Sequence, residues 1–205
     1  MVTSIDQLDL NRTYTYADYL LWQLKEKIQL FKGKIFAMSP APKRIHQDIS
    51  RRLVRTMLGV FDEECGCKLY YAPFDVRLSE NTVVQPDVCV ICDTSKLDER
   101  GCKGAPDLVV EILSPTNTEN DTKQKFELYQ ESGVREYWVV YPFADYKAIH
   151  IYCLENGKYI AQPPIIEGDT VTSIAFPSLS FSTKELFLEL GKVGWTHTVL
   201  ALLIS

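Results

Sequence analysis

Glu111 lies inside a run that is otherwise apolar, from Leu108 to Leu113. A run this rich in Val, Ile and Leu, bounded by prolines, predicts a strand buried on both faces. An ionised carboxylate buried there costs several kcal/mol unless a partner compensates it, and a metal ion is a natural partner. Asp87 follows Pro86 and opens a second apolar strand. Two acidic residues on neighbouring core strands predict a site for a hard divalent cation.

The order of Pro-Asp, strand, loop, strand with a carboxylate and then a lysine is typical of a Mg²⁺-dependent phosphodiesterase. Two carboxylates hold the ion, which polarises the scissile phosphate and lowers the pKa of bound water. A lysine steers that water and stabilises charge on the phosphorane. In the simplest form of the motif the lysine comes two residues after the acid, where this chain has Leu113. Lys125 is the best replacement, because it shares the apolar side of the next predicted helix with Leu128 and Tyr129.

Each of these residues also has a purely structural interpretation. Glu111 could pair with a core arginine or lysine, and Asp87 could be a turn residue that begins a strand. Lys125 could be a solvated helix lysine whose stem packs on a neighbouring ring. Asp107 also follows a proline, but at full extension it lies about 13 Å along the strand from Glu111, too far to share an ion.

Hydrophobic periodicity predicts the elements that must position these residues. A helix from about residue 43 to 61 has an apolar stripe of Ile45, Ile49, Leu53 and Met57. His46 borders that stripe, so it is either a core histidine or a site residue. The other predicted elements are a helix near 16–27, a hairpin at 28–31 and 34–38, a helix near 118–132, a strand at 137–141 and a hairpin at 147–153 and 158–160. The order predicts an α/β fold in which a mixed central β-sheet is flanked by helices.

Composition places the chain among ordinary globular proteins, with 205 residues, 46% hydrophobic and 24% charged. The net charge of −5 argues against a strongly basic nucleic-acid binder, although a local basic patch could suffice. No signal peptide or membrane span is expected, and the apolar tail at 199–204 is too short to span. These features predict a cytoplasmic protein without a membrane partner.

Six cysteines without an export signal favour reduced, buried thiols. The pairs Cys65/Cys67 and Cys89/Cys92 could be imagined as zinc ligands. However, Cys89 and Cys92 lie three apart in a predicted strand, so they point to opposite faces. Small buried hydrophobes are the preferred interpretation.

Most of the chain resembles a restriction-endonuclease family formerly catalogued as a domain of unknown function, a branch of the PD-(D/E)XK nuclease superfamily. The matching stretches are residues 38–42, His46-Gln47, 85–88, 106–115, Asp121 with Lys125 and Tyr129, and 133–140. The resemblance implies a single restriction-endonuclease-like domain over residues 1–205, with its core at about 15–185. It also implies metal ligands at Asp87, Glu111 and the backbone carbonyl of Ile112, with the family's migrated lysine at Lys125 and a recurring helix histidine at His46.

The resulting expectation is a Mg²⁺-dependent endonuclease acting on DNA, with Mn²⁺ able to substitute. Asp87, Glu111, Lys125 and His46 are the expected catalytic residues. A homodimer would suit an enzyme that cuts both strands, and the apolar tail could be buried there. Two rival functions stay open: a catalytically silent binding or scaffold protein with the nuclease fold, and a hydrolase of RNA or another phosphodiester.

Overall fold

The fold is described from a computed structural model, which places residues 2–37, 43–62, 64–114 and 119–188. The helices are α1 (Tyr16–Tyr19), α2 (Arg44–Leu58), α3 (Glu119–Ser132) and α4 (Thr183–Phe187), with 3-10 turns at Ile5–Gln7 and Thr94–Lys96. Residues 38–42, Pro115 and the tail at 199–204, which the sequence analysis considers, lie outside the described residues. The side chain of Asp121 also lies outside them. No helix in these ranges is long and apolar enough to cross a membrane.

The main sheet has the strand order β12-β11-β10-β9-β6-β3, and β13 adds to β11. Its strands are β3 (Lys68–Tyr71), β6 (Val88–Ile91), β9 (Leu108–Ile112), β10 (Glu136–Phe143), β11 (Tyr146–Glu155), β12 (Lys158–Ala161) and β13 (Ile165–Ile166). Strands β9 and β10 are parallel and joined through α3, whereas β6 is antiparallel to β9. The sheet is therefore mixed, as the sequence predicts.

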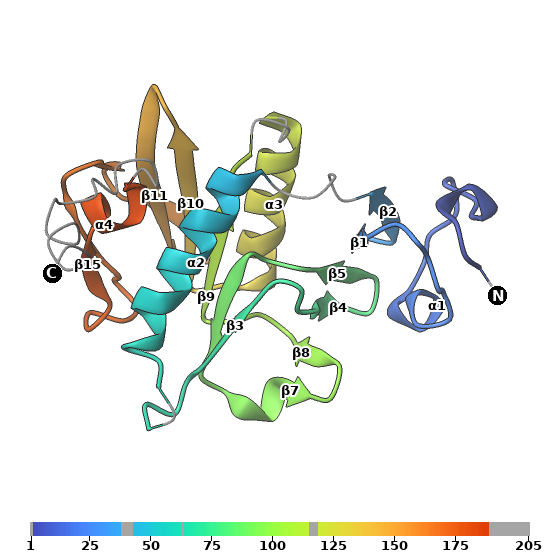
Figure 1. Cartoon of the computed structure of the whole chain (residues 1–205). Helices are drawn as coiled ribbons and strands as arrows, with labels where there is room; N and C mark the ends of the chain where they lie inside the picture. The colour runs from blue at the N-terminus through green and yellow to red at the C-terminus, as the bar shows by residue number, and fades with distance from the viewer. Residues whose placement is uncertain (1, 38–42, 63, 115–118, 189–205) are drawn as a thin grey trace, which may run out of the picture.

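A second sheet has the order β2-β1-β5-β4-β8-β7 and extends beside the main one (Figure 1). Its strands are β1 (Ile28–Phe31), β2 (Lys34–Ala37), β4 (Val76–Ser79), β5 (Thr82–Val84), β7 (Leu97–Asp98) and β8 (Gly101–Lys103). A two-stranded sheet of β14 (Thr170–Thr172) and β15 (Ser180–Ser182) lies next to α4 at the opposite end of the molecule.

Two helices cover the two faces of the main sheet, which explains the continuous apolar run in β9. One face packs against Ile49, Leu53 and Met57 of α2, and receives the side chains of alternate β9 residues, including Val110. The other face packs against α3 through residues that include Tyr129. Glu111 shares this second side by strand alternation, so its carboxylate is directed at α3.

The α2 helix differs from its predicted stripe at one position that matters for function. Ile45 is 40% exposed, whereas His46 is 8% exposed and lies on the buried side with Ile49. Ile49, Leu53 and Met57 are buried as predicted, but steps of four residues drift by about 40° each around a helix, so Ile45 falls outside the buried stripe. His46, one residue further on, takes that place on the buried side of α2.

The predicted helix at 16–27 is wrong in length, because α1 ends at Tyr19. Beyond it the backbone pairs with the N-terminal segment instead: Gln23 N–H donates to the Val2 carbonyl at 2.8 Å, and Trp22 forms a parallel bridge with Val2. Packing of Trp22 on Tyr14, at 4.9 Å between ring centroids, fixes that arrangement. A long-range contact has overridden the local helical periodicity.

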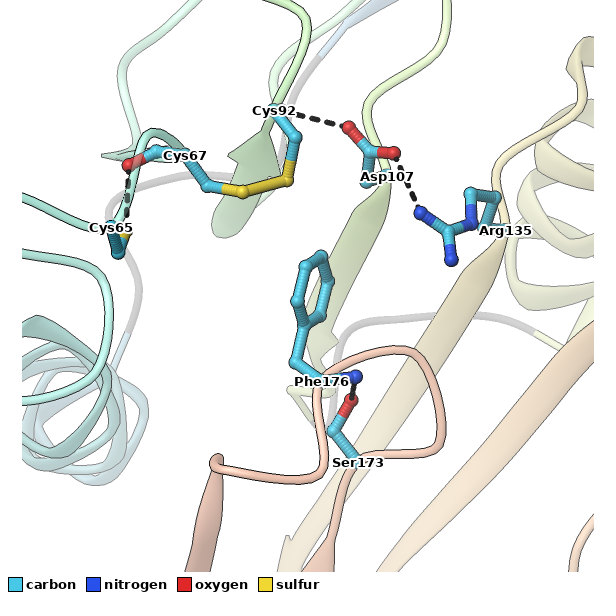
Figure 2. Close-up of a disulfide and its surroundings, with 7 residues drawn as sticks. All are labelled: Cys65, Cys67, Cys92, Asp107, Arg135, Ser173 and Phe176. Carbon is cyan, nitrogen blue, oxygen red and sulfur yellow. Dashed lines mark hydrogen bonds and ion pairs between the residues drawn. A yellow bond between two sulfur atoms is a disulfide. The ribbon is translucent and has the colours of Figure 1, made fainter.

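The expectation that the cysteines are reduced is wrong for one pair, since Cys67 and Cys92 form a disulfide (Figure 2). The register of β3 against β6 places Lys68 opposite Ile91, and one further residue brings the two cysteines face to face. Three other cysteines are buried free thiols, as predicted: Cys89, Cys102 and Cys153. Cys65 is exposed, close to the disulfide.

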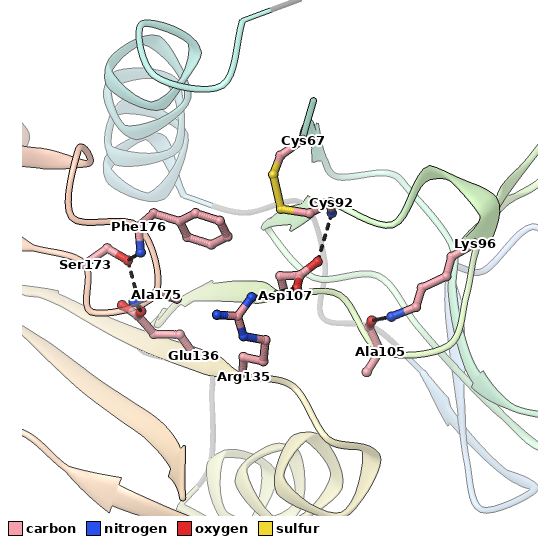
Figure 3. Close-up of polar contacts among 10 residues, drawn as sticks. All are labelled: Cys67, Cys92, Lys96, Ala105, Asp107, Arg135, Glu136, Ser173, Ala175 and Phe176. Atoms are coloured by element: carbon pink, nitrogen blue, oxygen red, sulfur yellow. Dashed lines mark hydrogen bonds and ion pairs between the residues drawn. A yellow bond between two sulfur atoms is a disulfide. The ribbon is translucent and has the colours of Figure 1, made fainter. Parts of the chain in front are cut away.

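Glu136, at the start of β10, is a fully buried carboxylate that was not singled out from the sequence. It accepts hydrogen bonds from Trp138 Nε1 at 2.5 Å, the Ser173 hydroxyl at 2.9 Å and the Ala175 amide at 2.6 Å. Figure 3 shows Glu136 beside Ser173 and Ala175, which belong to a loop that lies against the start of β10. Three donors to one carboxylate make its burial tolerable.

Candidate active site

Glu111 is 5% exposed and both of its carboxylate oxygens have partners from α3. Lys125 Nζ lies 2.8 Å from Oε2, and the Tyr129 hydroxyl donates a hydrogen bond to Oε1 at 2.7 Å. Lys125 and Tyr129 are four residues apart in the helix, so they reach the same point from successive turns. The ammonium is itself largely enclosed, with 19% of the side chain exposed.

Burial raises the pKa of Glu111 above its usual value, because the interior disfavours the charged form. The negative charge of Asp87 raises this pKa further, while the ammonium of Lys125 and the hydroxyl of Tyr129 oppose the shift. The two carboxylates are therefore close enough to repel each other. A cation between them would relieve that repulsion.

Asp87 is joined to the neighbouring strand by the backbone of Ile112. Its Oδ2 accepts the Ile112 N–H at 2.7 Å and lies 3.2 Å from His46 Nε2. Because Ile112 directly follows Glu111, one peptide unit connects the two acidic residues. Asp87 is also anchored through its own carbonyl, which accepts the Ala72 N–H at 3.1 Å.

His46 is held between opposing electrostatic effects. Burial lowers its pKa, but the hydrogen bond and charge of Asp87 raise it, and so do the charge of Glu111 and the backbone of Ile112. The sum of these effects is a raised pKa. The imidazole therefore gains a proton more readily than a free histidine and can donate it toward Asp87.

The structure brings all the expected site residues into one cluster. Asp87 contacts His46 and Ile112, and Glu111 contacts Lys125. The contact between Glu111 and Lys125 is what both the nuclease interpretation and the structural ion-pair interpretation predict, so it does not by itself choose between them. The role of the Ile112 carbonyl as a ligand stays a prediction, whereas its amide is engaged with Asp87.

Tyr129 is the member of the cluster whose contact with Glu111 the sequence analysis missed. The signal was present, because Tyr129 follows Lys125 by one helical turn on the same side. The sequence places Tyr129 on the apolar side of the helix and within the family match, but indicates no contact with Glu111. A hydroxyl at the end of a large ring can serve both the core and the carboxylate.

Leu113 occupies the usual lysine position and has a packing role instead. It is partly buried against the hydrophobic cluster that contains Leu128 and Tyr129 of α3. The strand thus contributes an apolar contact here, and the positive charge comes from Lys125 on the helix. The lysine that the simplest motif places on the strand is thus replaced by Lys125 of α3, which also contacts Glu111.

Asp107 is separate from the cluster, as the spacing predicts. Its Oδ2 accepts the Cys92 N–H at 2.8 Å, and its Oδ1 lies 3.2 Å from Arg135 Nη1 (Figures 2 and 3). These contacts connect the starts of β9 and β10 with the end of β6. Asp107 has a structural role at the opposite end of β9 from Ile112.

The donor set fits a hard divalent cation of the Mg²⁺ type. Within the described ranges, no three or more His, Cys, Asp or Glu side chains are grouped so that they could hold a metal ion. Mg²⁺ does not require such a group, because it is usually bound by one or two carboxylates, with water and phosphate oxygens completing its shell. Asp87, Glu111 and the Ile112 carbonyl would offer such an ion oxygen atoms alone, and Lys125 lies against one of the two carboxylates.

Comparison with known families matches residues 16–184 to the family model Uma2, described as "Putative restriction endonuclease". The match covers well over half of the chain and includes all five site residues. The chain belongs to the Uma2 family. This membership supports a nuclease role.

Two relatives extend the comparison beyond the Uma2 family model. A crystal structure from Anabaena variabilis, titled as a "putative nuclease belonging to DUF820", is similar with a TM-score of 0.67 over 85% of this chain and 97% of that chain. At 21% identity it supports the fold alone, and it confirms the restriction-endonuclease-like architecture. The uncharacterized protein slr1290 of Synechocystis is 32% identical over 115 residues, and the match spans 55% of this chain and 60% of that protein.

Proposed function

We propose that the chain is a Mg²⁺-dependent endonuclease that hydrolyses DNA phosphodiester bonds. The observation that carries the proposal is the convergence of two carboxylates and a lysine, with Lys125 Nζ 2.8 Å from Glu111 and the Ile112 amide 2.7 Å from Asp87. Membership in the Uma2 family adds the nuclease assignment.

Asp87, Glu111 and the Ile112 carbonyl would hold the ion, and Mn²⁺ would substitute for Mg²⁺. A bound Mg²⁺ would polarise the scissile phosphate and lower the pKa of water. The protein residues prepare this site before any ligand arrives: the Ile112 amide fixes one carboxylate and the Tyr129 hydroxyl fixes the other. Fixed ligands lose little freedom on binding, so the site is preorganised.

Lys125 and His46 supply the remaining chemistry. The Lys125 ammonium would orient the attacking water and stabilise negative charge that develops on the phosphorus centre. Its partial enclosure strengthens this effect, because charges interact more strongly away from bulk water. His46, hydrogen-bonded to Asp87, would assist substrate binding or proton transfer.

The experiment is a cleavage assay on purified protein, first stripped with EDTA and then given Mg²⁺ or Mn²⁺. Supercoiled, linear and single-stranded DNA and an RNA are the substrates. We expect metal-dependent DNA cleavage that Asp87→Ala and Lys125→Met each reduce by about 100-fold or more, on the order of losing one electrostatic catalytic group. Lys123→Met is the matched control on the same helix, since Lys123 is 72% exposed and pairs only loosely with Glu127 at 4.0 Å. Full activity of Asp87→Ala, or no cleavage of any DNA form, would contradict the proposal, and cleavage of the RNA alone would move it to a ribonuclease.

A catalytically silent nucleic-acid-binding protein is the second candidate, and one observation favours it. Both oxygens of Glu111 already have protein partners, Lys125 and Tyr129, so the site is electrostatically satisfied around this carboxylate without a ligand. Leu113 at the usual lysine position fits the same interpretation.

Calorimetric titration of the stripped protein with Mg²⁺ and Mn²⁺ separates the two candidates. The nuclease binds one equivalent of metal with heat that disappears in Asp87→Ala. A silent protein gives the same small dilution heat in both forms while still shifting DNA in a binding assay.

A further inference from the structure

Three of the six cysteines lie together beside β3 and β6, at the opposite end of β6 from Asp87 (Figure 2). Cys67 and Cys92 form the disulfide, and Cys65 is a free thiol two residues before Cys67. The function proposed above uses none of the three. A free thiol beside a disulfide supplies both reactants of thiol–disulfide exchange, in which a thiolate attacks one sulfur of the bond.

Among the residues that the structure describes, Cys65 is the one exposed free thiol. Cys89, Cys102 and Cys153 are buried. Burial raises the pKa of the Cys102 and Cys153 thiols to about 11, and it raises the pKa of Cys89 as well. Because the thiolate is the nucleophile, burial keeps these three thiols in their unreactive form. Cys65 is therefore the thiol available for exchange.

The Cys65 thiol lies against the residue whose sulfur it would attack. Its Sγ donates a hydrogen bond to the backbone carbonyl of Cys67 at 3.2 Å. Figure 2 shows Cys65 on the Cys67 side of the disulfide, away from Cys92. A thiolate approaches a disulfide sulfur from the side opposite the bond that breaks, because the leaving sulfur departs along that line. Cys65 is therefore positioned to attack Cys67 and to expel Cys92.

Gly66 makes the short link between Cys65 and Cys67 easy to rearrange. It is exposed and has a φ of +77°, and a Cβ at this position would meet no atom within 4 Å. Glycine adopts positive and negative φ values with similar ease. Formation of a bond between Cys65 and Cys67 therefore requires rotation about an exposed backbone segment against which nothing is packed.

The disulfide is less accessible than the Cys65 thiol. Cys67 and Cys92 are partly buried and pack against the hydrophobic cluster between α2 and the main sheet. The Cys92 amide donates to Asp107 Oδ2 at 2.8 Å, which holds this half of the bond in place. Access limits the rate at which a thiol in solution attacks a disulfide. Exchange through Cys65 would move the bond to the exposed segment at residues 65–67.

We propose that Cys65, Cys67 and Cys92 form a thiol–disulfide exchange site through which dithiols in solution reduce the protein. The Cys65 thiolate attacks the Cys67 sulfur and forms the Cys65–Cys67 bond. The Cys67–Cys92 bond breaks, and the Cys92 sulfur leaves with the electron pair and takes up the proton that Cys65 lost. This step consumes no oxidant or reductant. A dithiol then reduces the exposed bond, so that the protein ends with three thiols and the dithiol becomes a disulfide.

Disulfide mapping of the full chain tests the exchange step. Protein purified without reductant is incubated at pH 8, quenched with acid, alkylated with N-ethylmaleimide in denaturant, digested with trypsin and analysed by mass spectrometry. We expect two linkages: Cys67–Cys92 with alkylated Cys65, and Cys65–Cys67 with alkylated Cys92. The second is recognised as a single peptide with an internal disulfide, because no lysine or arginine separates Cys65 from Cys67.

The rate of reduction by dithiothreitol tests whether Cys65 is the point of entry. Cys65→Ser removes the attacking thiol, so the variant should hold the Cys67–Cys92 linkage alone and be reduced at least about tenfold more slowly than the wild type. Glu64→Ser, at the exposed neighbour of Cys65, is the matched control and should change neither the linkages nor the rate. Thermal melting of each variant checks that it is folded.

Three results would overturn the exchange site: a wild-type protein without the Cys67–Cys92 bond, one in which this is the single linkage, or equal reduction rates for the wild type and Cys65→Ser. The mapping uses the wild-type chain, so it decides the exchange step even where the variant is unstable. None of these measurements involves a metal ion or DNA. The exchange site and the nuclease therefore stand or fall separately.

Discussion

Replacing Lys125 by methionine tests how the protein tolerates a carboxylate at the centre of its sheet. The substitution keeps the length and apolar stem of the side chain and removes the charge that lies 2.8 Å from Glu111. Removal of one partner of a buried ion pair costs about 3–5 kcal/mol. Because 19% of the Lys125 side chain and 7% of the Glu111 side chain are exposed, we expect a loss of about 3 kcal/mol in the free energy of unfolding at pH 8.

The loss should depend on pH with a definite sign. Burial already raises the pKa of Glu111 in the folded protein, and loss of the ammonium raises this pKa further. A raised pKa means that the folded state binds a proton more tightly than the unfolded state. The associated stability is therefore fully present below the unfolded pKa of about 4.3 and is lost as pH rises through the folded pKa, by at most about 1.4 kcal/mol per pH unit.

Urea denaturation in EDTA at pH 5.5 and pH 8 measures both effects. The penalty for Lys125→Met should be smaller at pH 5.5, and Lys125→Met/Glu111→Gln should recover part of the loss at pH 8. Lys123→Met is the control, with an expected change of at most about 0.5 kcal/mol for an exposed lysine. Equal penalties for the two lysine variants, or a penalty independent of pH, would refute the account of Glu111 as a buried charge compensated by Lys125.

Three further predictions concern other buried groups. Tyr129→Phe removes the hydroxyl 2.7 Å from Glu111 and should cost about 1.5–3 kcal/mol in urea denaturation, the value of a hydrogen bond to a charged group; no loss would mean that water replaces the hydroxyl. Glu136→Gln presents an amide to a site filled by three donors, so we expect a loss of about 2–3 kcal/mol and a lower melting temperature, and a stability equal to that of the parent would contradict the network. Reduction of the disulfide between Cys67 and Cys92, which are 25 residues apart, should lower stability by up to about 3.5 kcal/mol by the loop-entropy estimate, and Cys92→Ser should then be insensitive to reductant.

Local sequence patterns were sufficient to predict elements that depend on neighbouring residues alone, such as a strand buried on both faces, a tight turn or one side of a helix. The run around Glu111 predicts a strand covered on both faces, and the structure confirms it with α2 on one side and α3 on the other. The hairpin turn at Asn156-Gly157 is confirmed by positive φ values of 50° and 78°, a conformation that these two residue types favour. Lys125 could be placed beside Glu111 because helical spacing is regular.

Features that depend on long-range register could not be predicted from the sequence. The end of α1 is decided by pairing of residues 22 and 23 with Val2, and the Cys67–Cys92 disulfide by the alignment of β3 with β6. The hydrogen bond from the Ile112 amide to Asp87 likewise requires the two strands to be in place. Residue type alone carries no information about such partners.

The site divides into a half that is local in sequence and a half that is not, and this has a consequence for folding. The contact between Glu111 and Tyr129 spans 18 residues within one strand–helix unit, whereas the contact between His46 and Asp87 spans 41 residues and joins separate parts of the chain. Local contacts form early in folding, while distant ones pay a larger loop-closure entropy. A nascent or partly folded chain should therefore hold the Glu111–Lys125 pair before Asp87 is in place. Such a chain could not assemble the two-carboxylate site until its last long-range contacts had formed.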